Sequence, residues 1–398
     1  MLSERESTPW GAIAACFLAA WFEGLDIQSM GVAAPKIAPF FHIGPQAMGF
    51  VLSASIVGLM VGAALGGWMS DQAGRRTVLV ASLGVLGIFS LGTSFVGNYD
   101  SLLLMRLLAG IGLGGVFPNL IAITSEIAPP RIRTTALALV YCGMPAGGAV
   151  AAWLTSITAP DNWHAVFQVG GAGPLFVIPL LLAFVPKYRP VGRLDGAPGN
   201  DRPRRIAHLF GARTRTTLLL WVAYFFTLFA VYLLLNWLPS LMMIGKGMTR
   251  DAAAQSALVL NLGAVFGSLI LGLAVDMGKL RWTLISAYSG MAIALVALVV
   301  AHGPGLQFAV FATGFFVIGG QLVLYALGPM VYPIMIRGSG IGAAVAAGRA
   351  GSILGPILAG LVLARGLGAA AVPAIAIPGI AIALVATLLL VSRQPEID

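Results

Sequence analysis

Charged residues are scarce along this chain: Asp, Glu, Lys and Arg make up 9% of its 398 residues, whereas 59% are hydrophobic. An average soluble domain carries roughly 25% charged residues, so this composition cannot cover a surface that faces water. The polar residues gather in short stretches between apolar runs of about 20 residues, each long enough to cross a bilayer as a helix. Runs such as 310–327 do not alternate between apolar and polar positions, which excludes a transmembrane β-barrel. The sequence therefore predicts an all-α polytopic membrane protein.

Residues that build disulfides, metal centres and catalytic sites are also few. The two cysteines, Cys16 and Cys142, lie inside apolar runs without other metal-binding residue types nearby. The four histidines are scattered at the ends of apolar runs and in loops: His42, His164, His208 and His302. No Gly-x-x-x-x-Gly-Lys-Ser/Thr loop occurs, which argues against an ATP-driven pump. We therefore expect no metal, no cofactor and no enzymatic activity, while a sensor that binds a solute without moving it stays open.

Twelve apolar runs are long enough to span a membrane. They lie near residues 10–33, 46–69, 77–96, 99–122, 134–156, 164–185, 217–239, 252–275, 282–301, 306–328, 341–364 and 371–391. The first run carries two acids and lacks a convincing small-residue cleavage site, so we interpret it as a retained helix and not as a signal peptide. The chain is thus predicted to cross the membrane twelve times.

The formal net charge of +9 has a topological explanation. Most of the 23 Lys and Arg residues fall in alternate loops, which the positive-inside rule assigns to the cytoplasm together with both termini. The basic residues expected on the outer side are Lys36, Lys246, Arg250 and Arg365. Because the basic residues flank membrane spans, we expect contact with lipid headgroups and no binding of nucleic acid.

An internal repeat divides the chain into two six-helix halves. Asp71 follows the second span and Asp276 follows the eighth, 205 residues later, while Arg133 and Arg337 precede the fifth and eleventh spans at an offset of 204. Two features that repeat after nearly the same number of residues indicate duplicated halves related by an axis along the membrane normal. We predict an N-terminal half over 1–186, a cytoplasmic linker rich in Pro, Gly and Arg over 187–216, and a C-terminal half over 217–398.

Two acids lie inside the first apolar run. Glu23 and Asp26 are three residues apart, which puts both carboxylates on one face of a helix. Two nearby carboxylates in a poorly solvated place raise each other's proton affinity, and removal from water acts in the same direction. We expect Glu23 or Asp26 to load and release a proton, the alternative being a carboxylate that is paired with a neighbouring helix.

Two arginines interrupt the apolar runs. Arg106 and Asp26 each lie 7 residues from the outer end of their spans, roughly 10 Å below the surface at 1.5 Å per residue. Arg106 is therefore a candidate to hold a carboxylate whose proton affinity changes when substrate binds, and we expect Arg106 or Arg349 to bind the substrate carboxylate. Arg349 lies nearer the midplane and is either a clamp for an anionic substrate or the partner of Glu23 or Asp26. The glycines that follow Arg106 favour close helix packing.

Further polar and aromatic groups lie at membrane depth. Asn119, Asn236 and Gln321 are candidates to bond substrate hydroxyls, although bonds between helices explain each of them equally well. Aromatic residues crowd the seventh and tenth spans and, as a group, suit a substrate with a ring. Outside the hydrocarbon, the turn containing Asp71, Gly74, Arg75 and Arg76 is a candidate gate between the second and third spans.

Three stretches resemble general motifs of the major facilitator superfamily. They are the loop 67–76, the run 106–115 and the stretch 143–148 in the fifth span, the last of which is also common among antiporters. A narrower resemblance, to the aromatic acid:proton symporter family, rests on 23–28, 118–126 and 337–356 and extends over essentially the whole chain. Most of that family has Asp-Gly-x-Asp in the first span. Glu23 departs from this pattern, as in transporters of the hydroxyphenylpropionate type, to which the chain is most similar.

The resemblance implies a function and a set of residues. The function is secondary active import of an aromatic carboxylate, of hydroxyphenylpropionate or hydroxybenzoate type, with a proton by alternating access across a bacterial cytoplasmic membrane, in a protein expected to be a monomer. The positions that the family needs for uptake fall on Glu23, Asp26, Arg106, Glu126, Arg337 and Arg349, with Asp71 in the gating loop and Glu126 and Arg337 placed beside it as gating residues. An efflux antiporter, or an importer of non-aromatic organic acids, is the alternative.

Overall fold

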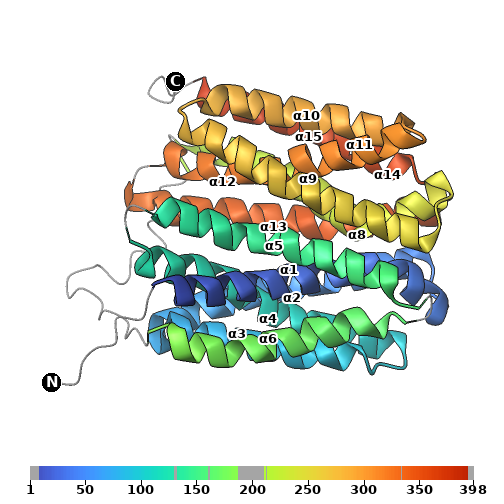
Figure 1. The fold of residues 1–398 in the computed structure, drawn as a ribbon. Helices are drawn as coiled ribbons and strands as arrows, with labels where there is room; N and C mark the ends of the chain where they lie inside the picture. Colours follow the sequence, from blue (N-terminus) through green and yellow to red (C-terminus); the bar gives the residue numbers. More distant parts are fainter. Residues whose placement is uncertain are drawn as a thin grey trace. The chain divides into compact units, whose positions relative to one another are not determined.

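A computed structural model of the protein describes residues 9–129, 132–159, 162–186, 210–211, 213–332 and 334–392. These residues form helices joined by short turns, with no β-strand among them (Figure 1). Twelve of the described segments are helical, long and apolar enough to cross a membrane. The predicted all-α fold of twelve membrane helices is therefore confirmed.

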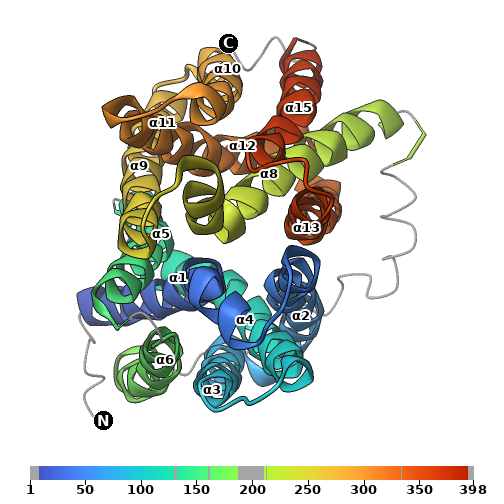
Figure 2. The same cartoon turned by 90° about the vertical axis from the view of Figure 1, so that its right-hand side faces the viewer.

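Six helices precede the predicted linker, most of which, 187–209 and 212, lies outside the described residues. They are α1 (Pro9–Phe40), α2 (Pro45–Ala73), α3 (Arg75–Thr93), α4 (Tyr99–Ile127), α5 (Arg133–Ile157) and α6 (His164–Phe184). In this group α1 packs against α5 and α6, and α3 packs between α4 and α6 (Figure 2). Buried alanine and leucine side chains fill the space between these helices, which allows the backbones to approach closely.

The second group of helices follows the linker. It contains α8 (Thr214–Lys246), α9 (Arg250–Asp276), α10 (Leu280–Val300), α11 (Pro304–Thr313), the π-helix η1 (Gly314–Ile318), α12 (Gly319–Val331), α13 (Ile334–Ala364), α14 (Ala371–Ala374) and α15 (Ala376–Val391). The tenth span is made of α11, η1 and the start of α12, and the last span of α14 and α15. Helix α8 packs against α13 and α15, and α9 packs against α11, η1 and α12.

The described residues group into two compact units. Those within Met1–Phe41 and Ala54–Arg193 form one unit, and those within His42–Ser53 and Leu194–Asp398 form the other. The first turns of α2 therefore pack with the second unit: Ser53 Oγ donates a hydrogen bond of 2.9 Å to the carbonyl oxygen of Ile353 on α13. The remainder of α2 belongs with α1 and α3–α6.

Helix α1 continues to Phe40, beyond the expected end near residue 33. Lys36 interrupts the apolar run, yet its side chain is only 5% exposed. Its ammonium donates to the carbonyl oxygens of Thr155, Thr158 and Ala159 at 2.9, 3.3 and 3.2 Å. The last carbonyls of a helix have no partner within it, so the charge at the end of α5 stabilises Lys36 inside the fold and lets α1 continue.

Candidate functional site

A buried ion pair joins α1 to α4. Arg106 Nη2 donates to Asp26 Oδ2 at 2.8 Å, and Nη1 donates to Oδ1 at 3.2 Å. Both side chains are completely buried. The two parallel bonds match the planar guanidinium to both carboxylate oxygens, which is the strongest geometry for such a pair. Each charge thereby neutralises the other in a place where an uncompensated charge costs several kcal/mol.

Side chains from three more helices complete the surroundings of this pair. Ser90 on α3 donates a short hydrogen bond to Asp26 Oδ1. Arg106 Nε donates to Ser55 Oγ on α2 at 3.1 Å, and the guanidinium carbon lies 5.4 Å from the centre of the Phe167 ring on α6. Five helices therefore contribute to one buried polar cluster, which we call the Asp26 cluster: Asp26, Ser55, Ser90, Arg106 and Phe167.

Glycines bring α2 and α4 close enough for Ser55 to reach Arg106. A Cβ atom on Gly110 would lie 2.1 Å from the carbonyl oxygen of Ser55, and one on Gly114 would lie 2.2 Å from that of Leu59. Any larger residue at either position would force the two backbones apart. The glycines after Arg106 thus serve helix packing, and the packing positions the Asp26 cluster.

Glu23 lies on α1 one turn before Asp26 and is 2% exposed. Next to it, Gly24 packs directly on α5, where a Cβ atom would lie 2.0 Å from the carbonyl oxygen of Met144. The two acids of the first span are both buried, but Arg106 bonds both carboxylate oxygens of Asp26. Protonation of Asp26 would therefore have to disrupt this pair.

The second unit contains a polar cluster around Arg349 on α13. Arg349 Nη1 donates to the hydroxyl of Tyr232 on α8 at 2.8 Å, with the guanidinium carbon 5.8 Å from the Tyr232 ring centre. On α12, Gln321 Nε2 donates to the hydroxyl of Tyr325 at 2.7 Å. The Tyr325 ring lies 5.7 Å from the ring of Tyr224 on α8, which packs on α13 at Gly348, beside Arg349. We call Tyr232, Gln321, Tyr325 and Arg349 the Arg349 cluster.

Both asparagines named from the sequence bond within their own unit. Asn119 Nδ2 donates to the carbonyl oxygen of Gly115 at 2.8 Å, and its Oδ1 accepts from Ser70 Oγ at 2.8 Å, which links α4 to α2. Asn236 Nδ2 donates to the carbonyl oxygen of Tyr232 at 2.7 Å. These bonds favour the helix-packing interpretation of Asn119, whose amide is engaged at both ends.

The turn predicted as a gate connects α2 to α3. Gly74 has φ 85°, in the region that favours glycine, and this allows the sharp entry into α3. Arg75 forms an ion pair with Glu126 at the end of α4, and Arg76 Nη2 donates to the carbonyl oxygen of Leu182 at 2.7 Å. The side chains of Asp71 and Arg337 lie outside the described residues.

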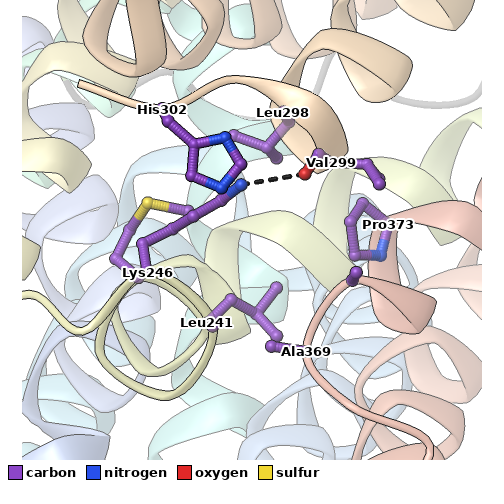
Figure 3. Close-up of a pocket in the computed structure, with 10 residues that line it drawn as sticks. Leu241, Lys246, Leu298, Val299, His302, Ala369 and Pro373 are labelled. Atoms are coloured by element: carbon purple, nitrogen blue, oxygen red, sulfur yellow. Dashed lines mark hydrogen bonds between the residues drawn. The ribbon is translucent and has the colours of Figure 1, made fainter. Parts of the chain in front are cut away.

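A hollow in the second unit is lined by none of the residues of the Arg349 cluster. A pocket of about 200 Å³ lies beside the end of α8, and Lys246 and His302 line it together with apolar side chains such as Leu241 and Pro373 (Figure 3). Lys246 Nζ donates to the carbonyl oxygens of Val299 and Ala301, both at 2.8 Å. Its charge thus stabilises the end of α10, as Lys36 does for α5.

Several residues of the two clusters were not identified from the sequence. Ser55 and Ser90 are serines in apolar helices, and no spacing distinguishes them from serines that bond their own helix, such as Ser29, which donates to the carbonyl oxygen of Leu25. Tyr232 and Tyr325 belong to the aromatic groups of the seventh and tenth spans, and membership of such a group assigns no role to a single residue. Their position near polar residues along the same helices, Asn236 and Gln321, is a signal that could have found them.

In this chain, charged side chains bond each other inside helices that are long and apolar enough to cross a membrane. Intramembrane charges are rare and mark the paths of solutes and protons, so the fold and these clusters define a multi-span membrane transporter. The chain belongs to the Major Facilitator Superfamily, whose family model matches residues 16–330. The membership predicted from the motifs is confirmed.

Characterised relatives are similar over almost the whole chain. The 3-(3-hydroxy-phenyl)propionate transporter of Escherichia coli (strain K12) is 45% identical over 390 residues, which cover 97% of this chain and 94% of that protein. The gallate transporter of Pseudomonas putida is 30% identical over 389 residues, covering 90% of this chain and 86% of that protein. The narrower resemblance to aromatic acid transporters is confirmed, and the chain is a transporter and not an enzyme.

Solved structures agree on the fold. The crystal structure of a D-xylose–proton symporter superposes with a TM-score of 0.77, covers 98% of each chain and is 17% identical. A structure of a nucleoside transporter gives a TM-score of 0.77 at 12% identity, covering 95% of this chain and 99% of the other. At such low identity this likeness concerns the fold alone.

Proposed function

We propose that this protein imports an aromatic carboxylate, of hydroxyphenylpropionate or hydroxybenzoate type, together with a proton by alternating access. The observation that carries the proposal is the 45% identity, over 97% of the chain, to a relative named for a hydroxyphenylpropionate. We place the protein in a bacterial cytoplasmic membrane, with both termini in the cytoplasm, acting as a monomer. The halves 1–186 and 217–398 are its moving parts, and 187–216 links them.

The substrate carboxylate binds at Arg349 in this proposal. The guanidinium carries a permanent charge and five N–H donors that suit a carboxylate. Tyr232, which accepts a hydrogen bond from Arg349 at 2.8 Å, positions that guanidinium. Arg106, by contrast, is already bonded to Asp26 within its own unit, which leaves Arg349 as the arginine for the substrate.

Glu23 carries the transported proton in this proposal. A protonated Asp26 would leave the Arg106 charge buried without compensation, which costs about 3–5 kcal/mol in buried pairs that lose one partner. Glu23 is equally buried, so loading a proton there removes a charge from the membrane interior. Asp26 and Arg106 then form the fixed part of the site.

The gate consists of Asp71, Gly74, Arg75, Arg76, Glu126 and Arg337. The Arg75–Glu126 pair supports this role because it joins the first turn of α3 to the last turn of α4. Both side chains are partly exposed, at 44% and 34%. An exposed pair contributes only about 0–1 kcal/mol, so it can open and close with little cost.

The test is a counterflow screen of the purified protein in liposomes. Hydroxybenzoates, phenylacetates, phenylpropionates and aliphatic acids are offered as competitors, with and without an inward proton gradient. We expect exchange of a phenolic carboxylate and its accumulation only when the outside is acidic. Accumulation driven by an outward proton gradient would indicate an efflux antiporter, and exchange of aliphatic acids alone would refute the aromatic part of the proposal.

A further inference from the structure

The direction of the hydrogen bonds in the Arg349 cluster separates two kinds of donor. We infer that Tyr325 and Gln321 recognise a hydroxyl group on the substrate ring, while Tyr232 and Arg349 hold the carboxylate. This inference rests on the proposed function and assigns its ring selectivity to α12.

At Tyr232 the hydroxyl oxygen is an acceptor. An arginine can only donate, so the bond from Arg349 Nη1 occupies a lone pair of the Tyr232 oxygen and directs the tyrosine's own hydrogen elsewhere. Tyr232 and Arg349 therefore form a unit in which the guanidinium and the phenol are both hydrogen-bond donors. A carboxylate, which only accepts when ionised, is the complementary ligand.

At Tyr325 the same logic leads to a different ligand. The hydroxyl oxygen accepts from Gln321 Nε2 at 2.7 Å, so the Tyr325 hydrogen is directed away from Gln321. The amide oxygen of Gln321 is an acceptor on the same side chain. The Tyr325 hydrogen and the Gln321 amide oxygen therefore offer one donor and one acceptor on neighbouring side chains. Together they match a phenolic hydroxyl, which is both a donor and an acceptor.

The ring of Tyr325 has a fixed position. It lies 5.7 Å, centre to centre, from the ring of Tyr224 on α8, which is itself fully buried. Tyr224 also packs on α13 beside Arg349, since a Cβ atom on Gly348 would lie 3.3 Å from Tyr224 Cβ, so the two donor units lie within one cluster of α8, α12 and α13. A substrate with a carboxylate at one end and a ring hydroxyl at the other can satisfy both units.

The π-helix determines which way Gln321 and Tyr325 point. Residues Gly314–Ile318 form η1 immediately before α12, and a Cβ atom on Gly314 would lie 1.8 Å from the carbonyl oxygen of Leu260 on α9. A π turn contains one residue more than an α turn and often occurs at functional sites. It turns the following helix by about 100° relative to an uninterrupted α-helix.

Two acids that differ in one atom test the inference. Counterflow with 3-(3-hydroxyphenyl)propionate and competition by 3-phenylpropionate are measured for the wild type, Tyr325→Phe, Gln321→Leu, Tyr232→Phe and the control Tyr288→Phe. Tyr288 bonds Thr227 at 2.9 Å and belongs to neither cluster. Its variant controls for loss of a buried phenol.

We expect Tyr325→Phe and Gln321→Leu to weaken the apparent affinity for the hydroxylated acid about tenfold, the effect of one hydrogen bond of about 1.4 kcal/mol. Their affinity for 3-phenylpropionate stays at the wild-type value, which also shows that they fold. Tyr232→Phe lowers the apparent affinity for both acids equally. The inference is overturned if Tyr325→Phe and Gln321→Leu both lose affinity for the two acids equally, or if both variants keep the wild-type selectivity between the two acids. Failure of the wild type to exchange either acid refutes the proposed function instead.

Discussion

Arg106 and Asp26 face each other edge to edge, with two parallel hydrogen bonds of 2.8 and 3.2 Å and no exposed surface on either side chain. The pair comes from α1 and α4 and is held in place by serines of α2 and α3. Such a pair costs desolvation of both charges, so its contribution depends on both partners being present. The first prediction follows from this dependence.

Removal of one partner of this pair should destabilise the protein strongly. Asp26→Asn leaves the Arg106 charge buried, at a cost of about 3–5 kcal/mol, and we expect a lower midpoint of thermal unfolding in detergent together with loss of uptake. The double variant Asp26→Asn/Arg106→Gln should be more stable than Asp26→Asn alone, because it buries no charge. Ser90→Ala should cost about 2 kcal/mol, and Ser29→Ala serves as its control. A double variant less stable than Asp26→Asn would contradict the role of the pair.

Replacement of Glu23 should abolish proton-driven accumulation of substrate but leave the exchange of substrate across the membrane intact. Glutamine has nearly the same shape as glutamate but cannot load a proton, so Glu23→Gln should keep counterflow and lose accumulation driven by external acid. Both are measured with radiolabelled substrate in liposomes at fixed membrane potential. Asp100→Asn, at an exposed acid in the first turn of α4, is the control. Accumulation at the wild-type level in Glu23→Gln would assign the proton to another group.

A larger residue at position 110 should separate α2 from α4. In Gly110→Val the new side chain would meet the backbone of Ser55, because a Cβ atom there lies 2.1 Å from a carbonyl oxygen. Overpacking costs about 1–3 kcal/mol or more, and here it also displaces Ser55 from Arg106. We expect a lower unfolding midpoint and less monodisperse protein in size-exclusion chromatography. Gly67→Val, with no atom within 4 Å of its Cβ, should behave like the wild type.

Swapping the side-chain charges of Arg75 and Glu126 should show whether the two residues act as a pair. Arg75→Glu and Glu126→Arg each place like charges together, and each should slow counterflow, whereas the double exchange should restore the rate. The unfolding midpoint should change little in all three variants, since exposed ion pairs contribute only about 0–1 kcal/mol. A double variant as slow as the single variants would show that the pair does not control the gate.

The membrane spans could be predicted from the sequence because the bilayer sets the length of an apolar run. The fourth span begins at Tyr99 and the last ends at Val391, both where the runs indicate. The first and seventh spans depart most from the runs, because they continue past their expected ends near 33 and 239 to Phe40 and Lys246. In the first span, Lys36 marks the end of an apolar run in the sequence but in the structure neutralises the end of α5. A charge that binds backbone groups far along the chain cannot be recognised from hydropathy.

The clusters could be predicted only in part. Depth along a helix is a count of residues, so Asp26 and Arg106 could be placed at one level, and the structure brings them together. The rotation of each helix about its axis depends on packing, and a serine in an apolar helix gives no sign of it. Ser90 and Tyr325 owe their positions to such rotations.

The π turn in the tenth span lets the helix take up one extra residue without turning the residues that follow. Deletion of one residue from 314–318 would restore an ordinary α-helix of nearly the same length, still long enough to span the membrane. The shorter α-helix has the same total rotation as the longer helix with its wide turn, so Gln321 and Tyr325 would still face the Arg349 cluster. A single codon gained or lost at this place can therefore change the contact with α9 while the ring-facing surface of α12 keeps its residues and its direction.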